Sequence, residues 1–136
     1  ESRRTKSLNV IAPNPAKVSN PERVSPPTLK RNKVNGIKCL QVKQGDTFYG
    51  LSKKAGLTIA ELRHLNDMSE DHVLQVGEYL FLEPKKKKNK EHDGHYVREG
   101  DTWYSISQLY GIRKDNLMKM NSKHRYLTVG ITLRLN

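Results

Sequence analysis

Residues 41–66, QVKQGDTFYGLSKKAGLTIAELRHLN, occur a second time in altered form as YVREGDTWYSISQLYGIRKDNLMKMN at residues 96–121. The two stretches align without a gap, and the match resumes with VGEYLFL at residues 76–82 against VGITLRL at residues 129–135. The first copy has a longer segment between its Asn and its last Gly, which indicates a surface loop at that point. The chain therefore contains two copies of one small structural unit.

The pattern inside each copy predicts a strand, two helices and a second strand. Leu40 and Val42 alternate with polar residues, as do His95 and Val97, which indicates a short half-buried strand. Gly-Asp-Thr then turns the chain, with Asp or Thr as the N-cap of a helix that ends at a Gly. We predict an α+β fold of two small βααβ units, each a two-stranded antiparallel sheet with two helices on one face.

The second helix of each copy begins differently. In the first copy, Thr58 and Glu61 form a capping-box pattern. In the second copy Arg113 stands at the matching position, so this helix start is less well specified. Both helices are expected to end at an asparagine, Asn66 or Asn121, because asparagine tolerates the positive φ that is common at helix ends.

Composition separates the remaining chain into a tether and a linker. Residues 1–37 hold every proline except Pro84 and no aromatic residue, which predicts a basic, flexible tether. Residues 84–94, PKKKKNKEHDG, predict a self-repelling, solvated linker. The two units then occupy residues 38–83 and 95–136. Because the linker is long and charged, we expect two beads on a string with little shared interface.

Length, charge and cysteine content exclude several classes of protein. The chain has 136 residues and a single cysteine, Cys39, which excludes an internal disulfide framework and a multi-cysteine zinc site. No stretch approaches the roughly 20 apolar residues of a membrane-spanning helix. The net charge of +11 is typical of nucleic-acid binders, but most of the excess lies in the tether and the linker. The chain begins at Glu1 with no signal-like run, so we expect a mature form or a fragment.

The sequence shows no cluster of residues suited to catalysis or metal binding. A glycosidase needs two carboxylates flanking one cleft, whereas Asp46 and Asp101 are matching positions of separate copies. His92 and His95 lack a third convergent ligand. We therefore predict no enzyme activity for this chain, no metal and no cofactor.

The ordered series of motifs resembles the LysM domain. It consists of a β-branched residue before Gly-Asp-Thr-aromatic, a helix ending in Gly, a helix ending in Leu-x-x-x-Asn, and Val-Gly-x-x-Leu-x-Leu. The series occurs twice and covers most of the chain. The resemblance implies a non-catalytic module that binds glycans containing N-acetylglucosamine, with peptidoglycan preferred over chitin. In that family the sugar lies in a shallow groove between two loops.

Carried onto this sequence, the resemblance places the grooves in the two copies. The first groove would use Gly45, Asp46, Thr47 and Phe48 together with Asp67, Met68 and Ser69 of the loop at residues 67–74. The second groove would use Gly100, Asp101, Thr102 and Trp103 together with Ser122, Lys123 and Tyr126 of the loop at residues 122–127. Met68 and Tyr126 are expected to be exposed, whereas Leu74 and Leu127 are expected to lie under their loops.

Some of these residues have a second interpretation. Asp46 and Asp101 also fit an N-capping role, which contributes about 1 kcal/mol. Phe48 and Trp103 also fit the role of core anchors at a helix start, and partial exposure would allow both roles.

The resemblance also implies a source, a location and partners. We expect a bacterial, extracytoplasmic, monomeric module, in the periplasm, in the cell wall or secreted, that forms the C-terminal wall-binding part of a peptidoglycan hydrolase such as a glucosaminidase. Peptidoglycan or a chitin-type glycan is the expected partner, and an anionic cell-wall polymer is a second one. Two alternatives stay open: a binder of anionic polymers or nucleic acid through the basic segments, of which nucleic acid is the less expected ligand, and an interaction module with vestigial grooves.

Overall fold

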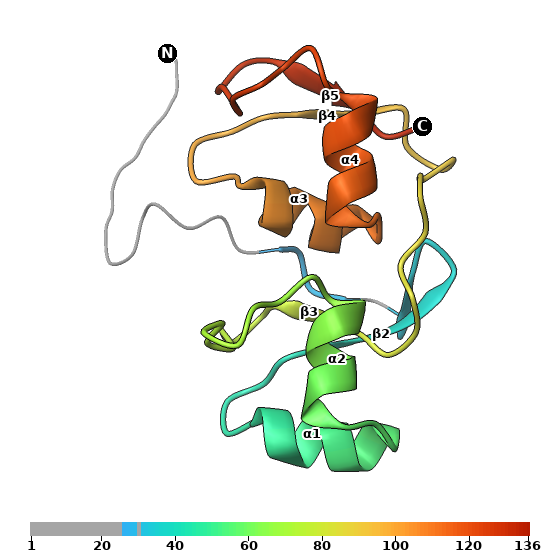
Figure 1. Cartoon of the computed structure of the whole chain (residues 1–136), viewed down its shortest axis with the longest axis vertical. Helices are drawn as coiled ribbons and strands as arrows, with labels where there is room; N and C mark the ends of the chain where they lie inside the picture. The colour runs from blue at the N-terminus through green and yellow to red at the C-terminus, as the bar shows by residue number, and fades with distance from the viewer. Residues whose placement is uncertain (1–25, 30) are drawn as a thin grey trace.

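The computed structural model describes residues 26–29 and 31–136, so the predictions for residues 1–25 lie outside the described part. Two units lie one above the other, the first below and the second above (Figure 1). The elements are β1 (Lys33–Val34), β2 (Ile37–Gln41), α1 (Phe48–Ala55), α2 (Ile59–Leu65), β3 (Tyr79–Phe81), β4 (Gly94–Tyr96), α3 (Trp103–Tyr110), α4 (Lys114–Met120) and β5 (Thr132–Arg134).

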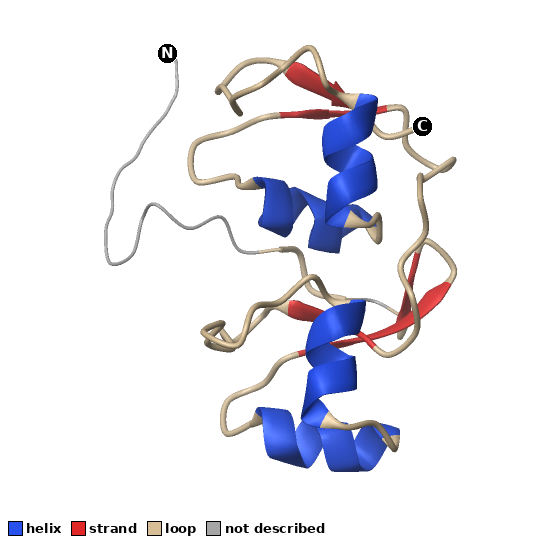
Figure 2. Ribbon diagram, in the orientation of Figure 1, coloured by secondary structure: helices blue, strands red, loops and turns tan. Residues whose placement is uncertain are grey.

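Each unit contains the predicted strand–helix–helix–strand series. Strands β2 and β3 pair antiparallel in the first unit, and β4 and β5 pair antiparallel in the second. Each sheet is accompanied by its own pair of helices (Figure 2). The first core is built from Val42, Leu51, Leu62, Met68 and Leu80, and the second from Val97, Ile106, Ile112, Leu117, Leu133 and Leu135. The predicted α+β class and the βααβ units are confirmed. No helix in the described ranges is long and apolar enough to cross a membrane.

The Gly-Asp-Thr turn divides two tasks between its polar residues. Thr47 is the N-cap of α1 and accepts a hydrogen bond from the Gly50 N–H at 3.0 Å, and Thr102 caps α3 in the same way. Asp46 and Asp101 instead each accept a bond from the backbone N–H three residues before them. The capping role considered for the aspartates therefore belongs to the threonines, while the aspartates close the turn.

An asparagine joins the second helix of each unit to its last strand. Asn66 donates its side-chain amide to the Leu62 and Phe81 carbonyls at 2.8 and 2.9 Å, and its Oδ1 accepts the Phe81 N–H at 2.6 Å. Asn121 makes the matching bonds between α4 and β5. The expectation of a positive φ is wrong, since φ is −111° at Asn66 and −118° at Asn121. Asparagine is present at both positions because its amide bonds a helix and a strand at once.

The first sheet has an additional strand. β1 pairs antiparallel with β2 through a turn at Asn35 and Gly36, whose φ values are 57° and 76°. The Tyr79 hydroxyl donates to the Pro27 carbonyl at 2.8 Å. These segments belong to the stretch 1–37 assigned to the tether, yet here they pack on the first unit. Asn-Gly is a strong hairpin signal because both residues tolerate positive φ, and it outweighs the local composition.

The two units pack directly against each other, which differs from the expected beads on a string. Helix α3 of the second unit lies on β3 of the first. Its Tyr104 packs against the first core, and its Leu109 packs against a cluster of Ile37, Cys39, Tyr79 and Phe81. Burial raises the pKa of the Cys39 thiol to about 12, so this group stays protonated inside the cluster.

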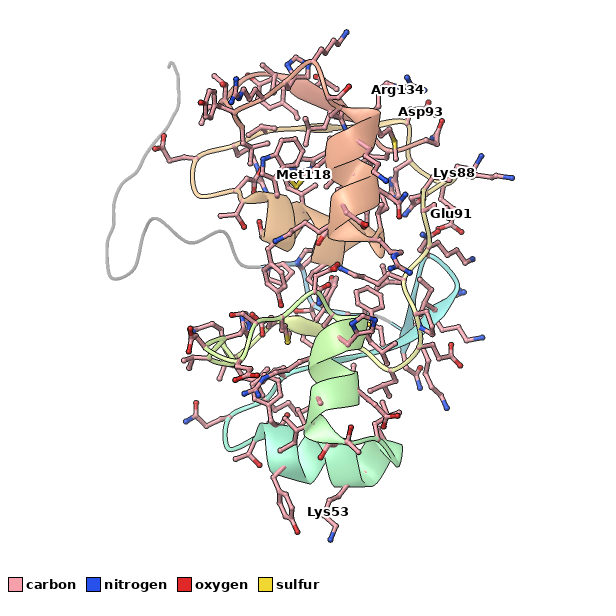
Figure 3. The ribbon with its side chains drawn as sticks, in the orientation of Figure 1. Lys53, Lys88, Glu91, Asp93, Met118 and Arg134 are labelled. Carbon is pink, nitrogen blue, oxygen red and sulfur yellow. The ribbon has the colours of Figure 1, made fainter. Side chains whose placement is uncertain are left out.

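The matching face of α1 explains why only one of the two repeats docks. Tyr49, Lys53 and Lys54 stand where Tyr104, Gln108 and Leu109 stand in α3. Tyr49 is 63% exposed, and the Lys53 side chain extends from the lower end of the molecule (Figure 3). Burying two ammonium groups is costly, so the face of α1 stays solvated while the face of α3 is buried.

The lysine-rich linker is fixed to the second unit at several points. Lys85 is 4% exposed and Asn89 is 2% exposed, so the segment is not a fully solvated spacer. The Lys86 backbone forms an isolated parallel bridge with Ile112. Asn89 donates its amide to the Tyr110 carbonyl at 2.9 Å. Composition alone misses these contacts, because they depend on partners far along the chain.

The glycines that end α1 and α3 offer a matched test of this packing. Gly56 and Gly111 both adopt left-handed φ, 73° and 68°. A Cβ at position 56 would meet nothing within 4 Å, whereas one at 111 would lie 2.9 Å from the Asn35 Cβ and 3.3 Å from the Val34 carbonyl. We expect Gly56→Ala to cost about 1 kcal/mol for backbone strain, and Gly111→Ala to cost about 2–3 kcal/mol because overpacking is added. Urea unfolding of both variants measures this, and equal costs would contradict the interface.

Candidate functional site

Four loops form two pairs, one in each unit. Loop pair 1 consists of residues 42–47 and 66–78, and loop pair 2 consists of residues 97–102 and 121–131. All four loops project toward the left side of the molecule in Figure 1. These are the segments in which the sequence predicted the site.

Backbone hydrogen bonds close each pair at its base. In loop pair 1 the Gly77 N–H donates to the Val42 carbonyl at 2.8 Å, and in loop pair 2 the Gly130 N–H donates to the Val97 carbonyl at 3.0 Å. The two glycines have φ values of 93° and 99°, where a side chain would be strained. This base geometry is the same in both units, and it holds the two loops of each pair side by side.

The Gly-Asp-Thr turns form the first wall of each pair. Gly45 and Gly100 adopt φ of 90° and 88°, and both are exposed together with Thr47 and Thr102. Because the aspartate carboxylate of each turn is bonded inward, the turn keeps a fixed backbone conformation. The first wall of each pair therefore contains three of the predicted turn residues, namely Gly45, Asp46 and Thr47 in loop pair 1 and Gly100, Asp101 and Thr102 in loop pair 2.

Phe48 and Trp103 follow the turns and are half-buried. Each packs against the core of its own unit, which fits the role of a core anchor. The Phe48 ring lies edge-on to His72 of the opposite loop, with centroids 6.4 Å apart. The Arg63 guanidinium lies over the same ring, 4.5 Å from its centroid. The Phe48 ring thus has His72 of the opposite loop and Arg63 of α2 as neighbours.

The second walls expose apolar side chains at matching positions. Val73 and Tyr126 are equivalent in the alignment of the two copies, and they are 70% and 75% exposed. Val76 and Val129 are also equivalent, and they are 62% and 56% exposed. Sequence reasoning found Tyr126 but missed the three valines. The repeat alignment, extended back from Val76 and Val129, contained the signal that would have identified Val73.

Met68 is not an exposed residue of this wall, so the expectation for it is wrong. It is 8% exposed and belongs to the first core, against which Leu74 also packs. Asp67 adopts a φ of 55°, and the Met68 N–H donates to the Arg63 carbonyl at 2.9 Å. This turn directs Met68 inward, whereas Ser69 beside it is exposed.

The carboxylate of Asp67 is engaged between the units. Its Oδ2 lies 2.7 Å from the Lys85 Nζ and accepts the Lys114 N–H at 3.0 Å. Desolvation opposes ionisation of Asp67, but these two contacts outweigh it and hold the pKa of the carboxyl below its ordinary 3.8. Asp67 was predicted for the first groove, and the structure shows its carboxylate already paired with Lys85.

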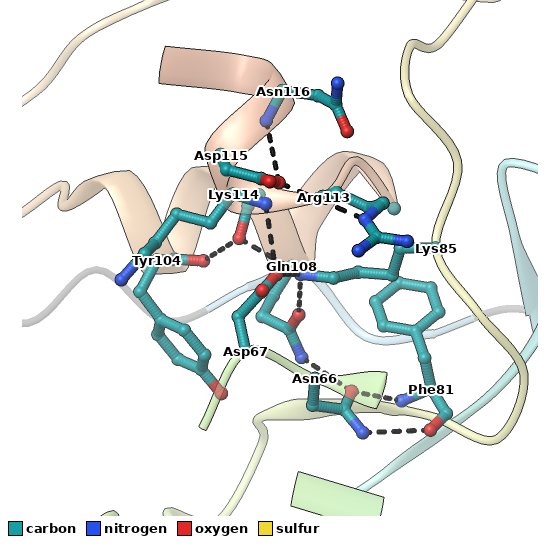
Figure 4. A network of polar contacts seen from close by, with 12 residues as sticks. Asn66, Asp67, Phe81, Lys85, Tyr104, Gln108, Arg113, Lys114, Asp115 and Asn116 are labelled. Atoms are coloured by element: carbon teal, nitrogen blue, oxygen red, sulfur yellow. Dashed lines mark hydrogen bonds and ion pairs between the residues drawn. The ribbon is translucent and has the colours of Figure 1, made fainter. Parts of the chain in front are cut away.

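The Asp67–Lys85 pair belongs to a larger polar network at the interface (Figure 4). The Lys85 ammonium also donates to the Gln108 Oε1 at 2.7 Å. Gln108 in turn donates to the Asn66 Oδ1 at 3.0 Å and to the Tyr79 carbonyl at 2.9 Å. Burial lowers the pKa of Lys85, and Asp67 partly offsets that effect. The network holds α3 on β3 and so keeps the two loop pairs in one fixed relation.

A histidine fixes the turn of loop pair 2. His95 is 6% exposed, and its two ring nitrogens lie 2.7 Å from the Tyr110 hydroxyl and 2.8 Å from the Asp101 Oδ2. Loop pair 1 has Leu40 at the matching position, so its turn lacks this support. The ring of His92 lies against the ring of Tyr110, and it does not share a metal-binding position with His95. In the part of the chain that the structure covers, no group of three or more metal-ligating side chains is present.

The loop after α4 carries the remaining predicted residues. Ser122, Lys123 and Tyr126 are all exposed, and the Arg125 guanidinium lies 5.8 Å from the Tyr126 ring centroid. The second wall of loop pair 2 is therefore basic as well as apolar.

Comparison with known proteins identifies a known family in two segments of the chain. A family model described as "LysM domain" matches residues 40–82 and 95–135. The chain is 32% identical over 103 residues to "Probable peptidoglycan endopeptidase LytE" of Bacillus subtilis (strain 168), covering 71% of this chain and 30% of that protein. It is 30% identical over 84 residues to "Cell wall-binding protein YocH" of the same strain, covering 61% of this chain and 28% of that one.

The comparisons also include a third relative and a solved structure. The chain is 27% identical over 88 residues to "N-acetylmuramoyl-L-alanine amidase sle1" of Staphylococcus epidermidis, covering 63% of this chain and 27% of that protein. The crystal structure of the Bacillus cereus spore cortex-lytic enzyme SleL shows 31% identity and a TM-score of 0.31, covering 74% of this chain and 22% of that one. The chain thus spans less than a third of each of these proteins. Since the family model matches most of the chain, the protein belongs to the LysM domain family, with one domain at residues 40–82 and another at residues 95–135.

Proposed function

We propose that this chain is a carbohydrate-binding module that binds a glycan containing N-acetylglucosamine, with peptidoglycan preferred over chitin. The observation that carries the proposal is the matched pair of walls. Each unit presents a Gly-Asp-Thr turn opposite a loop that exposes two apolar side chains at equivalent positions. An arrangement that recurs in both units, on one side of the molecule, is the arrangement expected of a repeated binding site.

The two walls offer complementary chemistry for an N-acetylated sugar. The turn at Gly45 leaves backbone close to solvent, where peptide groups can bond the acetamide and hydroxyl groups of a sugar. Val73 and Val76 supply apolar surface for the faces of the sugar ring and its methyl group, and Tyr126 and Val129 do so in the second unit. Side chains with an apolar body and a polar tip, such as Tyr126, suit a partly wet site.

The fixed relation of the two units supports binding to one polymer through both sites. Once the first site is occupied, the second binding event is intramolecular, which adds about 10²–10⁴ in avidity when both sites are reachable. The interface network removes the linker freedom that would otherwise be lost on binding. A module of this kind would anchor an attached enzyme to an insoluble wall.

The relatives support a cell-wall role for the protein from which this chain comes. LysM is a binding domain, and the matched proteins are named as a probable peptidoglycan endopeptidase, a cell wall-binding protein and an N-acetylmuramoyl-L-alanine amidase. We propose that the chain itself is non-catalytic, works outside the cytoplasm as a monomer, and anchors a peptidoglycan hydrolase. A glucosaminidase is our proposal for that enzyme.

Replacing the exposed wall residues tests the assignment of the site. We expect Tyr126→Ala and Val73→Ala together to weaken binding of a soluble N-acetylglucosamine oligomer about tenfold, because apolar contact with the sugar is removed from both units. Isothermal titration of the full chain measures the affinity. Tyr49→Ala is the matched control, since Tyr49 is 63% exposed but lies outside both loop pairs. Loss of affinity in the control alone, or no loss in the double variant, would contradict the assignment.

A further inference from the structure

A concave basic surface lies where the linker meets the β1–β2 hairpin. It encloses a volume of about 510 Å³ and is lined by Asn35, Gly36, Lys86, Lys87, Lys88, Lys90 and Glu91. The linker runs along the right side of the molecule in Figure 1, whereas the loop pairs project to the left. The side chain of Lys88 points outward near Glu91 (Figure 3). We call this surface the lysine pocket.

The linker backbone is held in place on both sides of these lysines. Lys85 is buried before them, and Asn89 is buried among them. The Lys86 N–H donates to the Gly111 carbonyl at 3.1 Å, and the Arg113 N–H donates to the Lys86 carbonyl at 2.8 Å. The lysines are therefore presented by a fixed backbone, and not by a mobile tail that adapts to every anion.

The hairpin completes the pocket from the first unit. The Asn35 amide donates to the Lys88 carbonyl at 3.0 Å and to the Gly111 carbonyl at 3.2 Å. Gly36 has a φ of 76°, and a Cβ at this position would lie 3.1 Å from the Lys86 Nζ. Absence of a side chain at Gly36 thus leaves room for an ammonium group at the hairpin tip. The pocket is thus formed jointly by the linker and the β1–β2 hairpin of the first unit.

Within the described residues, the lysines of the pocket are not paired with acidic side chains. Four lysines and one carboxylate line it, and none of the four forms a salt bridge with another residue of the described ranges 26–29 and 31–136. Holding like charges on a fixed backbone is unfavourable, and a polyanion would offset that repulsion. Lysine ammonium groups bind phosphate as point charges, and several in a row suit a chain of repeated phosphates better than one planar carboxylate.

We propose that the lysine pocket binds a phosphodiester polyanion of the cell wall, as a second contact beside the glycan sites. The location of this ligand in the wall rests on the proposed function, whereas the phosphate chemistry rests on the pocket. The pocket lies on the side away from the loop pairs, so the polyanion and the glycan occupy separate surfaces. The module then recognises two chemically different polymers of one wall at once.

The test uses inorganic polyphosphate as a probe and the full chain in three forms. We expect the triple variant Lys86→Gln, Lys87→Gln and Lys88→Gln to lose affinity for polyphosphate on the order of tenfold. The slope of log K against log salt concentration should also become shallower by about 1 for each lysine that is replaced. The matched control is Lys53→Gln, Lys54→Gln and Lys119→Gln, which removes the same charge from exposed helix positions. Its affinity should change by less than about threefold, because charges distant from the pocket are screened.

Equal losses in the two triple variants would overturn the proposal, since net charge would then account for binding. No loss in the pocket variant would also overturn it. Duplex DNA that binds as tightly as polyphosphate, and competes with it, would overturn the wall ligand in favour of nucleic acid. Retention of N-acetylglucosamine oligomer binding by the pocket variant shows that the fold and glycan sites are intact.

Binding to isolated cell walls tests whether the polyanion that the lysine pocket binds comes from the wall. Hydrofluoric acid cleaves phosphodiester-linked polymers from walls and leaves the glycan. We expect acid treatment to reduce retention of the unaltered chain to the level of the pocket variant on untreated walls. Unchanged retention would contradict a wall polyanion, even where polyphosphate binds. Failure of glycan binding with intact polyphosphate binding would instead contradict the proposed function and leave the pocket chemistry standing.

Discussion

Asn66→Ala is expected to destabilise the first unit by about 3–5 kcal/mol, because buried backbone groups lose their partners. The Asn66 side chain is fully buried and bonds the Leu62 carbonyl, both backbone groups of Phe81 and the Gln108 amide. Alanine leaves these groups unpaired in a site that water does not reach. Urea unfolding followed by circular dichroism measures the total loss. Fluorescence of Trp103, the single tryptophan, reports the second unit separately.

Asn121→Ala is the control within the same chain. Asn121 makes the same three bonds inside its own unit, but among the described residues it has no partner equivalent to Gln108. We expect its cost to be about 1 kcal/mol lower than that of Asn66→Ala, and we expect Asn66→Ala alone to separate the two unfolding signals. A loss below about 1 kcal/mol for Asn66→Ala would show that its bonds are not needed.

Asp67→Ala is expected to cost about 3–5 kcal/mol, because it leaves the buried Lys85 ammonium without its counter-charge. The side chain of Lys85 is 1% exposed, and its Nζ lies 2.7 Å from the Asp67 carboxylate. The loss should appear as uncoupling of the two units, since Asp67 and Gln108 hold Lys85 between them. Urea unfolding should then show two transitions in place of one.

The double variant Asp67→Ala, Lys85→Met separates this cause from loss of packing. Removing both charges should recover most of the stability, because an apolar side chain replaces an unpaired ion. No recovery in the double variant would contradict the assigned role of the pair.

The same carboxylate makes the interface sensitive to acid. The pKa of Asp67 is lowered in the folded chain, so its stabilising contribution is complete above the ordinary value of 3.8. That contribution is lost as the pH falls through the lower, folded pKa, because the unfolded chain then binds the proton more readily. Asp67→Asn should remove this acid dependence. An identical acid transition in the variant would assign the sensitivity to other groups.

The repeat allowed much of each unit to be predicted. Thr58 and Glu61 form the capping box that their spacing indicated. The first helix of each unit ends at a glycine as predicted, and Gly56 and Gly111 both adopt the left-handed conformation there. Leu74 packs against the first core under its loop, as the repeat indicated. These features depend on neighbours within a few residues, and local sequence carries that information.

The relation between the units was not predictable in the same way. The linker reads as a solvated spacer, yet Lys85 is buried because Asp67 and Gln108, both distant in sequence, surround its ammonium group. Asp67 and Met68 were assigned to the groove by position in the repeat, but one is used by the interface and the other by the core. Tertiary contacts specific to this pair of units overrode the pattern common to both.

The difference between the two repeats becomes informative once the interface is known. Helix α3 has Gln108 and Leu109 where α1 has Lys53 and Lys54. The first pair permits burial and supplies an amide that bonds Asn66, whereas the second pair keeps the end of the array in solvent.

The most direct test of a glycan-anchoring module is retention of the full chain on insoluble peptidoglycan at high salt, with chitin alongside. Salt screens the contribution of the basic segments, so the remaining binding reports the loop pairs. We expect retention on peptidoglycan to persist, to exceed that on chitin, and to be competed by soluble N-acetylglucosamine oligomers. Retention that disappears at high salt, or that resists the oligomers, would contradict groove-mediated glycan binding.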